Sequence, residues 1–273
     1  MHNFQRIAKQ IIKAPLQRIG LDVVRRRKHS SDPARWGSTL PAARWLSSIP
    51  IRTVIDVGAN TGQFAIGARQ VWPEAQLFCF EPVRTTYEQL VESTRADRAI
   101  ETFPVALGES EGTLTINHNE FSPSSSILEM SRLHKDNFPF TANAHMEKVR
   151  VCQLDAVLAG RTLEKMLLLK LDVQGYELNV LRGARNVLAA SSVIIIETSF
   201  AMLYENQPLF HDVYSYLASQ GFLFAGMLEQ YFSPINGQIL FSDSLFVRGA
   251  PNSDTSQHPT VLLGYVPPPA VLT

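Results

Sequence analysis

Four residues in the first half of the chain have the types and the spacing of a nucleoside-binding site. An apolar run contains Asp56 near its end, and the turn that follows it contains Gly58 and Gly62. A second apolar run ends in Glu81. Glycines let the backbone approach a ligand, and an acid at the end of the next strand accepts hydrogen bonds from ribose hydroxyls. The pattern therefore predicts a strand, a glycine turn and a helix that hold a nucleoside.

The glycine spacing excludes two common nucleotide-binding loops. A dinucleotide fingerprint needs Gly-x-Gly-x-x-Gly for its pyrophosphate, but Asn60 takes the place of the second glycine. A phosphate-binding loop needs Lys and then Ser or Thr after its last glycine, but Gln63 follows Gly62. A purely structural turn between a strand and a helix also fits the glycines taken alone.

The remaining pattern, Asp-x-Gly-x-x-x-Gly, resembles the first motif of class I S-adenosylmethionine (SAM) methyltransferases. SAM carries an amino-acid tail, a sulfonium and an adenosine, but no phosphate. The resemblance implies that Asp56 receives the ammonium of the tail, directly or through water. The turn of Gly58, Asn60 and Gly62 would leave room for it, and Glu81 would bind the two ribose hydroxyls.

Two further acids end apolar runs in the second half of the chain, Asp172 after 167–171 and Glu197 after 193–196. In an open parallel sheet, ligands lie outside the carboxyl ends of the strands. Asp56, Glu81 and Asp172 should therefore converge on one crevice, with Glu197 beside Asp172.

Two roles are open for Asp172 in a transfer to a hydroxyl group. It can act as a general base, or it can join Glu197 in holding a Mg²⁺ that binds two neighbouring sugar hydroxyls, since oxygen ligands suit Mg²⁺ better than zinc. The structural alternative is that the two acids cap the helices that follow, or pair with Lys170 or Arg182.

The residues around Asp172 carry a second, more specific resemblance. The run Lys-Leu-Asp-Val-Gln-Gly-Tyr-Glu at 170–177, with Val-Leu-Arg-Gly-Ala at 180–184, resembles the hallmark of FkbM-type methyltransferases. Further matches are the motif at 56–62, Phe80-Glu81-Pro82, Ser124-Ser125-Ser126, Glu197-Thr198-Ser199-Phe200, Tyr204, Gln207-Pro208-Leu209, Asp243 and Leu245-Phe246-Val247-Arg248. The resemblance runs from about residue 52 to residue 248.

This resemblance implies SAM-dependent methyl transfer, usually to a hydroxyl oxygen of a glycolipid, polysaccharide, antibiotic or polyketide. Some sugar methyltransferases similar to this group use a divalent metal and carry a histidine where this chain has Gly175. His118, His134, His145 and His211 remain as candidate bases elsewhere.

The loop-like segment 120–126 offers further hydroxyl groups. Those of Ser125 and Ser126 can contact the cofactor tail, and the alternative is an ordinary polar turn.

Apolar runs and helical patterns alternate from residue 53 onward, which predicts a Rossmann-like α/β fold. We expect a mostly parallel seven-stranded sheet with helices on both faces and a small inserted antiparallel hairpin. Strands are expected at about 53–57, 77–81, 101–105, 113–117, 147–152, 167–172, 193–198, 222–228 and 242–248. Helices are expected at about 62–71, 84–95, 155–159, 176–189 and 208–220.

Composition and charge divide the 273 residues into three regions. Residues 1–50 are predicted to be a basic, amphipathic helical extension with a linker, 51–249 the methyltransferase domain, and 250–273 a Pro-rich tail. The chain has zero net charge, but residues 1–30 hold eight Lys or Arg against one acid. Residues 1–28 therefore suit an anionic membrane surface, and the alternative is packing on the domain or on a second subunit.

The rest of the chain is acidic on balance, which argues against a nucleic-acid partner. Two cysteines give no disulfide framework, and no apolar run spans a bilayer, so we expect a cytoplasmic protein that can lie at the inner face of the membrane.

The sequence thus predicts an O-methyltransferase for a sugar, glycolipid, polysaccharide or natural-product hydroxyl. Two alternatives stay open: a methyltransferase with a nitrogen or carbon acceptor, and a non-catalytic SAM-binding or membrane-associated protein. A homo-oligomer is compatible with the sequence, which leaves the oligomeric state open.

Overall fold

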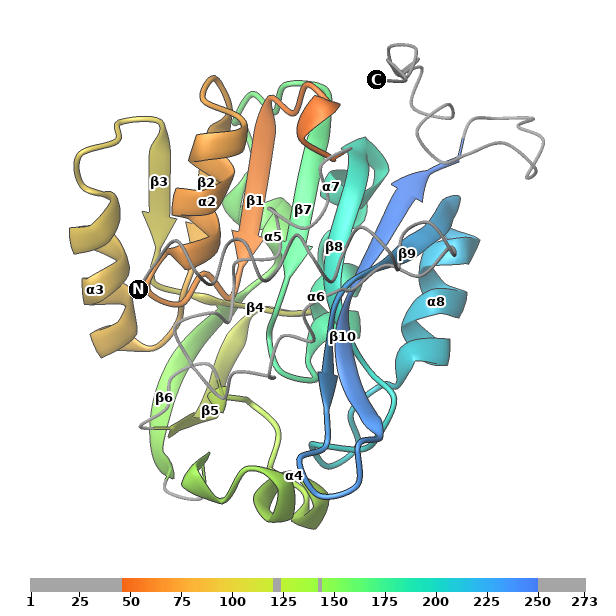
Figure 1. Cartoon of the computed structure of the whole chain (residues 1–273). Helices are drawn as coiled ribbons and strands as arrows, with labels where there is room; N and C mark the ends of the chain where they lie inside the picture. The colour runs from red at the N-terminus through yellow and green to blue at the C-terminus, as the bar shows by residue number, and fades with distance from the viewer. Residues whose placement is uncertain (1–45, 120–123, 142–143, 250–273) are drawn as a thin grey trace, which may run out of the picture. The chain divides into compact units, whose positions relative to one another are not determined.

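A computed structural model describes residues 46–119, 124–141 and 144–249 of the chain. Its centre is a seven-stranded sheet in the order β3-β2-β1-β7-β8-β10-β9, in which β10 runs antiparallel to both neighbours (Figure 1). The strands are β1 (Thr53–Val57), β2 (Gln76–Phe80), β3 (Ile100–Phe103), β7 (Leu167–Leu171), β8 (Ser191–Ser199), β9 (Phe222–Phe232) and β10 (Ile239–Arg248). The predicted fold class is confirmed.

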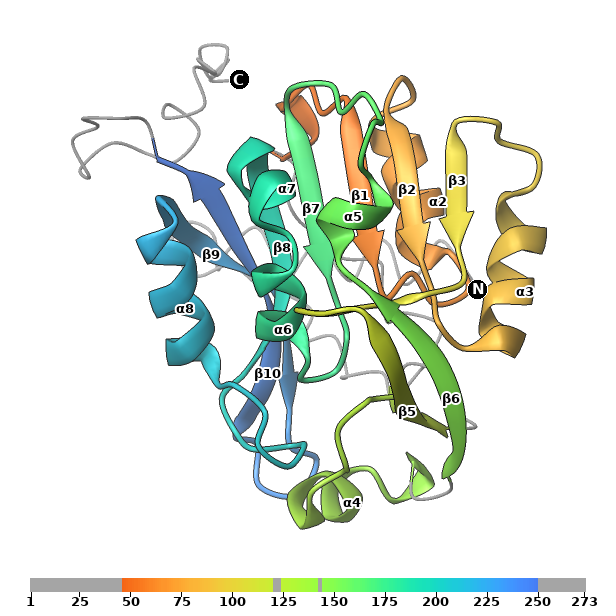
Figure 2. The same ribbon diagram turned by 180° about the vertical axis from the view of Figure 1, so that it is seen from behind.

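Helices cover both faces of this sheet, and each face has its own apolar core (Figures 1 and 2). One face packs against α5 (Leu154–Val157), α6 (Glu177–Arg182), α7 (Arg185–Ala190) and α8 (Phe210–Ser219). The other packs against a short 3-10 helix (Leu46–Ser48), α2 (Gln63–Val71) and α3 (Arg84–Thr94). Because both faces are buried, the central strands read as continuous apolar runs.

A second, three-stranded sheet lies beyond the carboxyl ends of the parallel strands (Figures 1 and 2). It consists of β4 (Ala106–Leu107), β5 (Gly112–Asn119) and β6 (Ala144–Cys152). β5 and β6 form the predicted antiparallel pair, and β4 adds a short parallel strand on the other side of β6. Between β5 and β6 the chain forms α4 (Arg132–Asn137) and a 3-10 turn (Pro139–Thr141).

Several elements differ from the sequence expectation, and three of the differences have a clear local cause. The single helix expected at 176–189 is two helices, α6 and α7, which meet where Gly183 packs against the backbone of Gly108. A Cβ at Gly183 would lie 2.0 Å from the carbonyl oxygen of Gly108, so the break follows from a close contact that is distant in sequence. β3 ends at Phe103 because Pro104 cannot continue the ladder. Helix α4 was not predicted, although Ser131 caps it by accepting a hydrogen bond from the backbone N–H of His134.

The extension at 1–45 and the tail at 250–273 lie outside the described residues, as do 120–123 and 142–143. The expectations for an amphipathic helix and for a membrane contact through residues 1–28 therefore fall outside them. In the described ranges, no helix combines the length and the apolar character that crossing a bilayer requires.

Candidate active site

The candidate site lies between β1 and β7, where the order of the strands reverses. β2 and β3 follow on one side of β1, while β8 follows on the other side of β7. Asp56 on β1 stands directly opposite Lys170 on β7. In open α/β sheets, ligands bind in the crevice outside the carboxyl ends of the strands at such a switch point.

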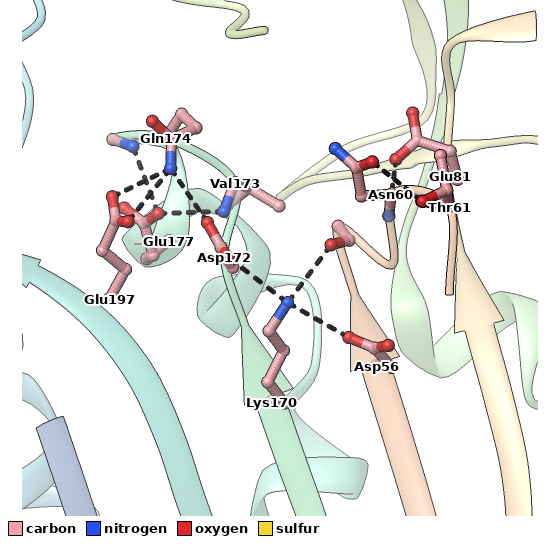
Figure 3. A network of polar contacts seen from close by, with 12 residues as sticks. Asp56, Asn60, Thr61, Glu81, Lys170, Asp172, Val173, Gln174, Glu177 and Glu197 are labelled. Carbon is pink, nitrogen blue, oxygen red and sulfur yellow. Dashed lines mark hydrogen bonds and ion pairs between the residues drawn. The ribbon is translucent and has the colours of Figure 1, made fainter. Parts of the chain in front are cut away.

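Lys170 joins the two acids on either side of this switch point (Figure 3). Its Nζ lies 3.2 Å from Asp56 Oδ1 and 3.4 Å from Asp172 Oδ2. It also donates to the carbonyl oxygen of Gly58 at 3.2 Å. Burial alone would lower the pKa of Lys170, but the carboxylates of Asp56, Asp172 and Asp243 together raise it. The side chain is therefore an ammonium group at neutral pH and connects the glycine turn to Asp172.

Asp56 is completely buried at the end of β1. Burial raises its pKa, and the ammonium of Lys170 lowers it in part. Its Oδ1 forms the ion pair with Lys170, whereas its Oδ2 has no partner within the described residues. An acceptor without a partner at this depth fits an ammonium group of a ligand. The depth of Asp56 favours the water-mediated contact over the direct one.

Contacts within the protein itself require the two glycines of this turn, whether or not a ligand is bound. Gly58 has φ +77°, and a Cβ there would lie 1.9 Å from the backbone oxygen of Asp172. Gly62 has φ +95° and lies against Ser93 on α3. Between them, Asn60 adopts φ 49° and points its backbone N–H at Glu81. The two glycines are needed because the turn after β1 touches the turn after β7 and packs on α3.

Glu81 anchors this turn from the end of β2 (Figure 3). Its Oε2 accepts from the backbone N–H of Asn60 at 3.0 Å, and its Oε1 accepts from that of Val83 at 2.9 Å. Burial raises the pKa of Glu81 to about 7, although both hydrogen bonds act in the opposite direction. Each oxygen has a second lone pair, so the carboxylate can also accept from ribose hydroxyls.

Asp172 and Glu197 share one hydrogen-bond donor, the side-chain amide of Gln174. The amide nitrogen lies 2.9 Å from Asp172 Oδ1 and 3.1 and 3.0 Å from the two oxygens of Glu197. Burial and the neighbouring carboxylates, Asp172 first among them, raise the pKa of Glu197 well above its ordinary value. The side chain of Asp172 is 33% exposed, whereas Glu197 is buried. Asp172 is therefore the acid of this pair that a substrate can reach.

This donor set does not fit a divalent cation as the side chains stand. The amide of Gln174 directs its hydrogens at both carboxylates, so it takes the place that a shared cation would need. In the described part of the chain, no group of three or more His, Cys, Asp or Glu side chains is placed to hold a metal ion. Mg²⁺ at Asp172 and Glu197 stays a prediction that the geometry does not favour.

The two predicted serines contact different parts of the chain, Ser126 the backbone of Gln174 and Ser125 that of Asn119. Ser126 Oγ donates to the backbone oxygen of Gln174 at 2.7 Å and accepts from Leu128 N at 3.0 Å. Ser125 Oγ accepts from the backbone N–H of Asn119. Their contact with a cofactor tail stays a prediction, and the hydroxyl of Ser126 is already used by the chain itself.

Sequence reasoning did not assign three residues of the site. The sequence suggested Lys170 only as an ion-pair partner of the acids in the structural alternative. It gave Gln174 only as part of the motif at 170–177. Asp243 stands opposite Glu197 on β10, and burial, with the nearby Asp172, raises its pKa to about 7. A lysine inside an apolar strand pattern was the available signal, because a buried ammonium group needs carboxylate partners.

Known proteins resemble this chain over the same region. A family described as "Methyltransferase FkbM domain" matches residues 56–224. The 2-O-methyltransferase NoeI of Sinorhizobium fredii is 28% identical over 180 residues, which cover 62% of this chain and 74% of that protein. The hexuronic acid methyltransferase AglP of Haloferax volcanii is 28% identical over 143 residues, covering 52% of this chain and 54% of that protein.

Solved structures also match this chain at low sequence identity. The magnesium protoporphyrin IX methyltransferase of Synechocystis, with bound SAH, superposes with a TM-score of 0.42 at 12% identity, covering 90% of this chain and 100% of that one. The family match spans more than half of the chain and contains the glycine turn, Glu81, Lys170 and Asp172. The chain therefore belongs to the FkbM methyltransferase family.

Proposed function

We propose that this protein is a SAM-dependent O-methyltransferase whose acceptor is a hydroxyl group of a sugar or of a sugar-containing molecule. The family supports methyl transfer, and two relatives are named for methylation at a 2-O position and of a hexuronic acid. The observation that carries the proposal is the position of Asp172. It is a partly exposed carboxylate that Lys170 holds next to the turn expected to bind the cofactor.

The residues of β1 and β2 would hold the cofactor. Glu81 would accept hydrogen bonds from the ribose hydroxyls, and Asp56 would attract the ammonium of the amino-acid tail. The turn from Gly58 to Gly62 would lie along the part of the cofactor between its ribose and its amino-acid tail. When bound, SAM supplies a methyl carbon that its positive sulfur activates for transfer.

Asp172 would act on the acceptor. An alcohol is a weak nucleophile, and a base that takes its proton in the transition state makes it effective. As the acceptor oxygen bonds to the methyl carbon, the bond between that carbon and the sulfur would break, the sulfur would keep the electron pair as a neutral thioether, and the hydroxyl proton would pass to the carboxylate of Asp172. Lys170 Nζ lies 3.4 Å from Asp172 Oδ2, and the amide of Gln174 donates to Asp172 Oδ1 at 2.9 Å, so both hold this carboxylate in place. Burial and the nearby carboxylates raise the pKa of Glu197 well above its ordinary value, and its side chain is buried, so the two acids would take different roles.

Transfer of a labelled methyl group tests this proposal. The purified full chain is incubated with methyl-tritiated SAM and a panel of monosaccharides, glycosides, uronic acids and polysaccharides, and the methylated atom is located by mass spectrometry and NMR. We expect label on an oxygen of at least one sugar. Label found only on nitrogen or carbon, or SAM binding without transfer to any acceptor, would contradict the proposal.

A further inference from the structure

Tyr204 lies behind the amide that holds the two acids. Its side chain is buried, and its hydroxyl donates to Gln174 Oε1 at 2.7 Å. On the other side of the same amide, Nε2 donates to Asp172 and Glu197. The three side chains form one line of hydrogen bonds, from the phenol to the amide and from the amide to the carboxylates.

The direction of this line is fixed by what each group can do. An ionised carboxylate only accepts hydrogen bonds, so the NH₂ end of Gln174 must face Asp172. In the reversed orientation, the amide oxygen would face the carboxylate of Asp172, and the NH₂ group would face the hydroxyl of Tyr204. Burial and the nearby carboxylates, that of Glu197 first among them, raise the pKa of Tyr204 well above its ordinary value, so this hydroxyl keeps its proton. It can therefore donate to the amide oxygen at 2.7 Å, which is closer than the other acceptor within its reach, the backbone oxygen of Ser124 at 3.4 Å.

Tyr204 is itself held in place by the segment that contains α4. The ring of His134 contacts the ring of Tyr204 edge-on, with 5.0 Å between centroids. The backbones of Met130 and Tyr204 form an isolated antiparallel bridge. Ser126 Oγ donates to the backbone oxygen of Gln174, whose φ of +54° is unusual for a residue with a side chain. Ser126 thus holds the backbone of Gln174 in its unusual conformation, and Tyr204 holds its side-chain amide.

We infer that Tyr204 is a positioning residue for methyl transfer. Its hydroxyl orients the amide of Gln174, and the amide in turn holds the carboxylate of Asp172 aimed at the acceptor. This inference rests on the proposed role of Asp172 as the base. It also connects the segment 124–134 to the reaction, because that segment packs against Tyr204 and Gln174.

The orientation of the amide can be measured in the resting protein. With ¹⁵N-labelled glutamine, the side-chain NH₂ signals of Gln174 are assigned by their loss in Gln174→Met. In the wild type we expect two distinct protons that exchange slowly with water, because both are hydrogen-bonded. In Tyr204→Phe we expect them to exchange faster and to move toward the shifts of a solvated amide. Unchanged signals in Tyr204→Phe would overturn the inference.

Kinetics provide the second test. We expect Tyr204→Phe to lower kcat about tenfold, the effect of one lost hydrogen bond, with the KM for SAM unchanged. Gln174→Met should lower kcat at least as far, and the double variant should be no slower than Gln174→Met alone. Multiplying losses would show that Tyr204 acts independently of Gln174 and would overturn the inference.

A matched control shows whether the effect is specific to Tyr204 or follows from removing any tyrosine hydroxyl of this protein. Tyr87→Phe removes a hydroxyl that lies 3.1 Å from Thr102 Oγ1 on the distant edge of the sheet, and it should leave kcat and the Gln174 signals unchanged. A wild-type protein that methylates no acceptor refutes the proposed function. In that case the amide signals still decide whether Tyr204 orients Gln174.

Discussion

Asp56 and Lys170 stand opposite each other on neighbouring parallel strands, and their charged atoms lie 3.2 Å apart in the interior of the protein. The same ammonium group reaches Asp172, so one lysine contacts the acid expected on the cofactor side and the acid expected on the acceptor side. One side chain inside the sheet thus connects the two sides of the candidate site.

Removing Lys170 should destabilise the fold. Lys170→Met leaves Asp56 buried without a counter-charge, which costs about 3–5 kcal/mol of the free energy of unfolding. Urea denaturation followed by circular dichroism measures this loss. Adding Asp56→Asn to the Lys170→Met variant should restore part of the stability, because the uncompensated charge is gone. A double variant that is less stable than Lys170→Met alone would contradict the pairing.

Asp172→Asn should separate catalysis from cofactor binding. The amide is nearly isosteric but cannot take a proton from the acceptor, so we expect kcat to fall by about 10²–10⁴. The dissociation constant for SAM, measured by calorimetry, should change much less. A variant that keeps near-normal turnover would remove Asp172 from the proton-transfer step.

Gly58→Ala should destabilise the protein more than a matched glycine substitution. Gly58 and Gly160 share a φ of +77°, but a Cβ at Gly58 would meet Asp172 O at 1.9 Å, whereas nothing lies within 4 Å at Gly160. The backbone strain should cost each variant about 1–2 kcal/mol, and the clash should add about 1–3 kcal/mol at Gly58 alone. Equal losses in thermal denaturation would show that the contact with Asp172 does not constrain the turn.

SAM affinity should fall in mildly acidic solution because of Glu81. Its pKa is raised to about 7, so below that pH the carboxyl group becomes protonated and accepts ribose hydrogen bonds less well. Between about pH 8 and about pH 6 we expect the affinity to drop roughly tenfold. Glu81→Gln should bind SAM more weakly and should lack this part of the pH dependence. Parallel curves for the two proteins, measured by calorimetry, would exclude Glu81 as the titrating group.

The raised pKa of Glu81 affects the stability of the protein without SAM in the opposite direction: low pH favours the folded state. Between the ordinary value of 4.5 and about 7, the folded protein binds this proton more readily than the unfolded chain does. The stability that Glu81 contributes is therefore present at low pH and is lost as the pH rises toward 7 and above. Relative to wild type, Glu81→Gln should gain stability as the pH rises through this window, and denaturation midpoints at several pH values measure the difference.

Removal of divalent cations should leave methyl transfer intact. The amide of Gln174 fills the space between Asp172 and Glu197 that a shared Mg²⁺ would need. We therefore expect full activity after treatment with EDTA, compared with a sample to which excess Mg²⁺ has been added back. Activity that is lost with EDTA and restored by Mg²⁺ would show that these side chains rearrange around a metal.

The sequence predicted the sheet well because its strands are apolar and end in short turns. The bounds of β1 match those expected, and those of β2 differ by one residue at each end, since burial on both faces gives an unmistakable pattern. The break between α6 and α7 could not be predicted. It depends on Gly108, which lies far from Gly183 in the sequence.

The candidate site was predictable only in part. Acids at strand ends identified Asp56, Glu81 and Asp172, because parallel topology alone brings such residues together. The roles of Gln174 and Tyr204 were hidden, since a single hydrogen bond between residues far apart in sequence carries no periodic signal. The sequence also could not show what the hydroxyls of Ser125 and Ser126 bind. A hydroxyl in a loop can bind a ligand or the backbone of its own chain, and these two bind the backbone.

A crystal structure with bound S-adenosylhomocysteine tests the central claim most directly. We expect its ribose on Glu81, its amino-acid tail near the turn from Gly58 to Gly62, and its sulfur directed toward Asp172. A ligand bound elsewhere, or one whose sulfur points away from Asp172, would contradict the assignment of these residues to a single methyl-transfer site.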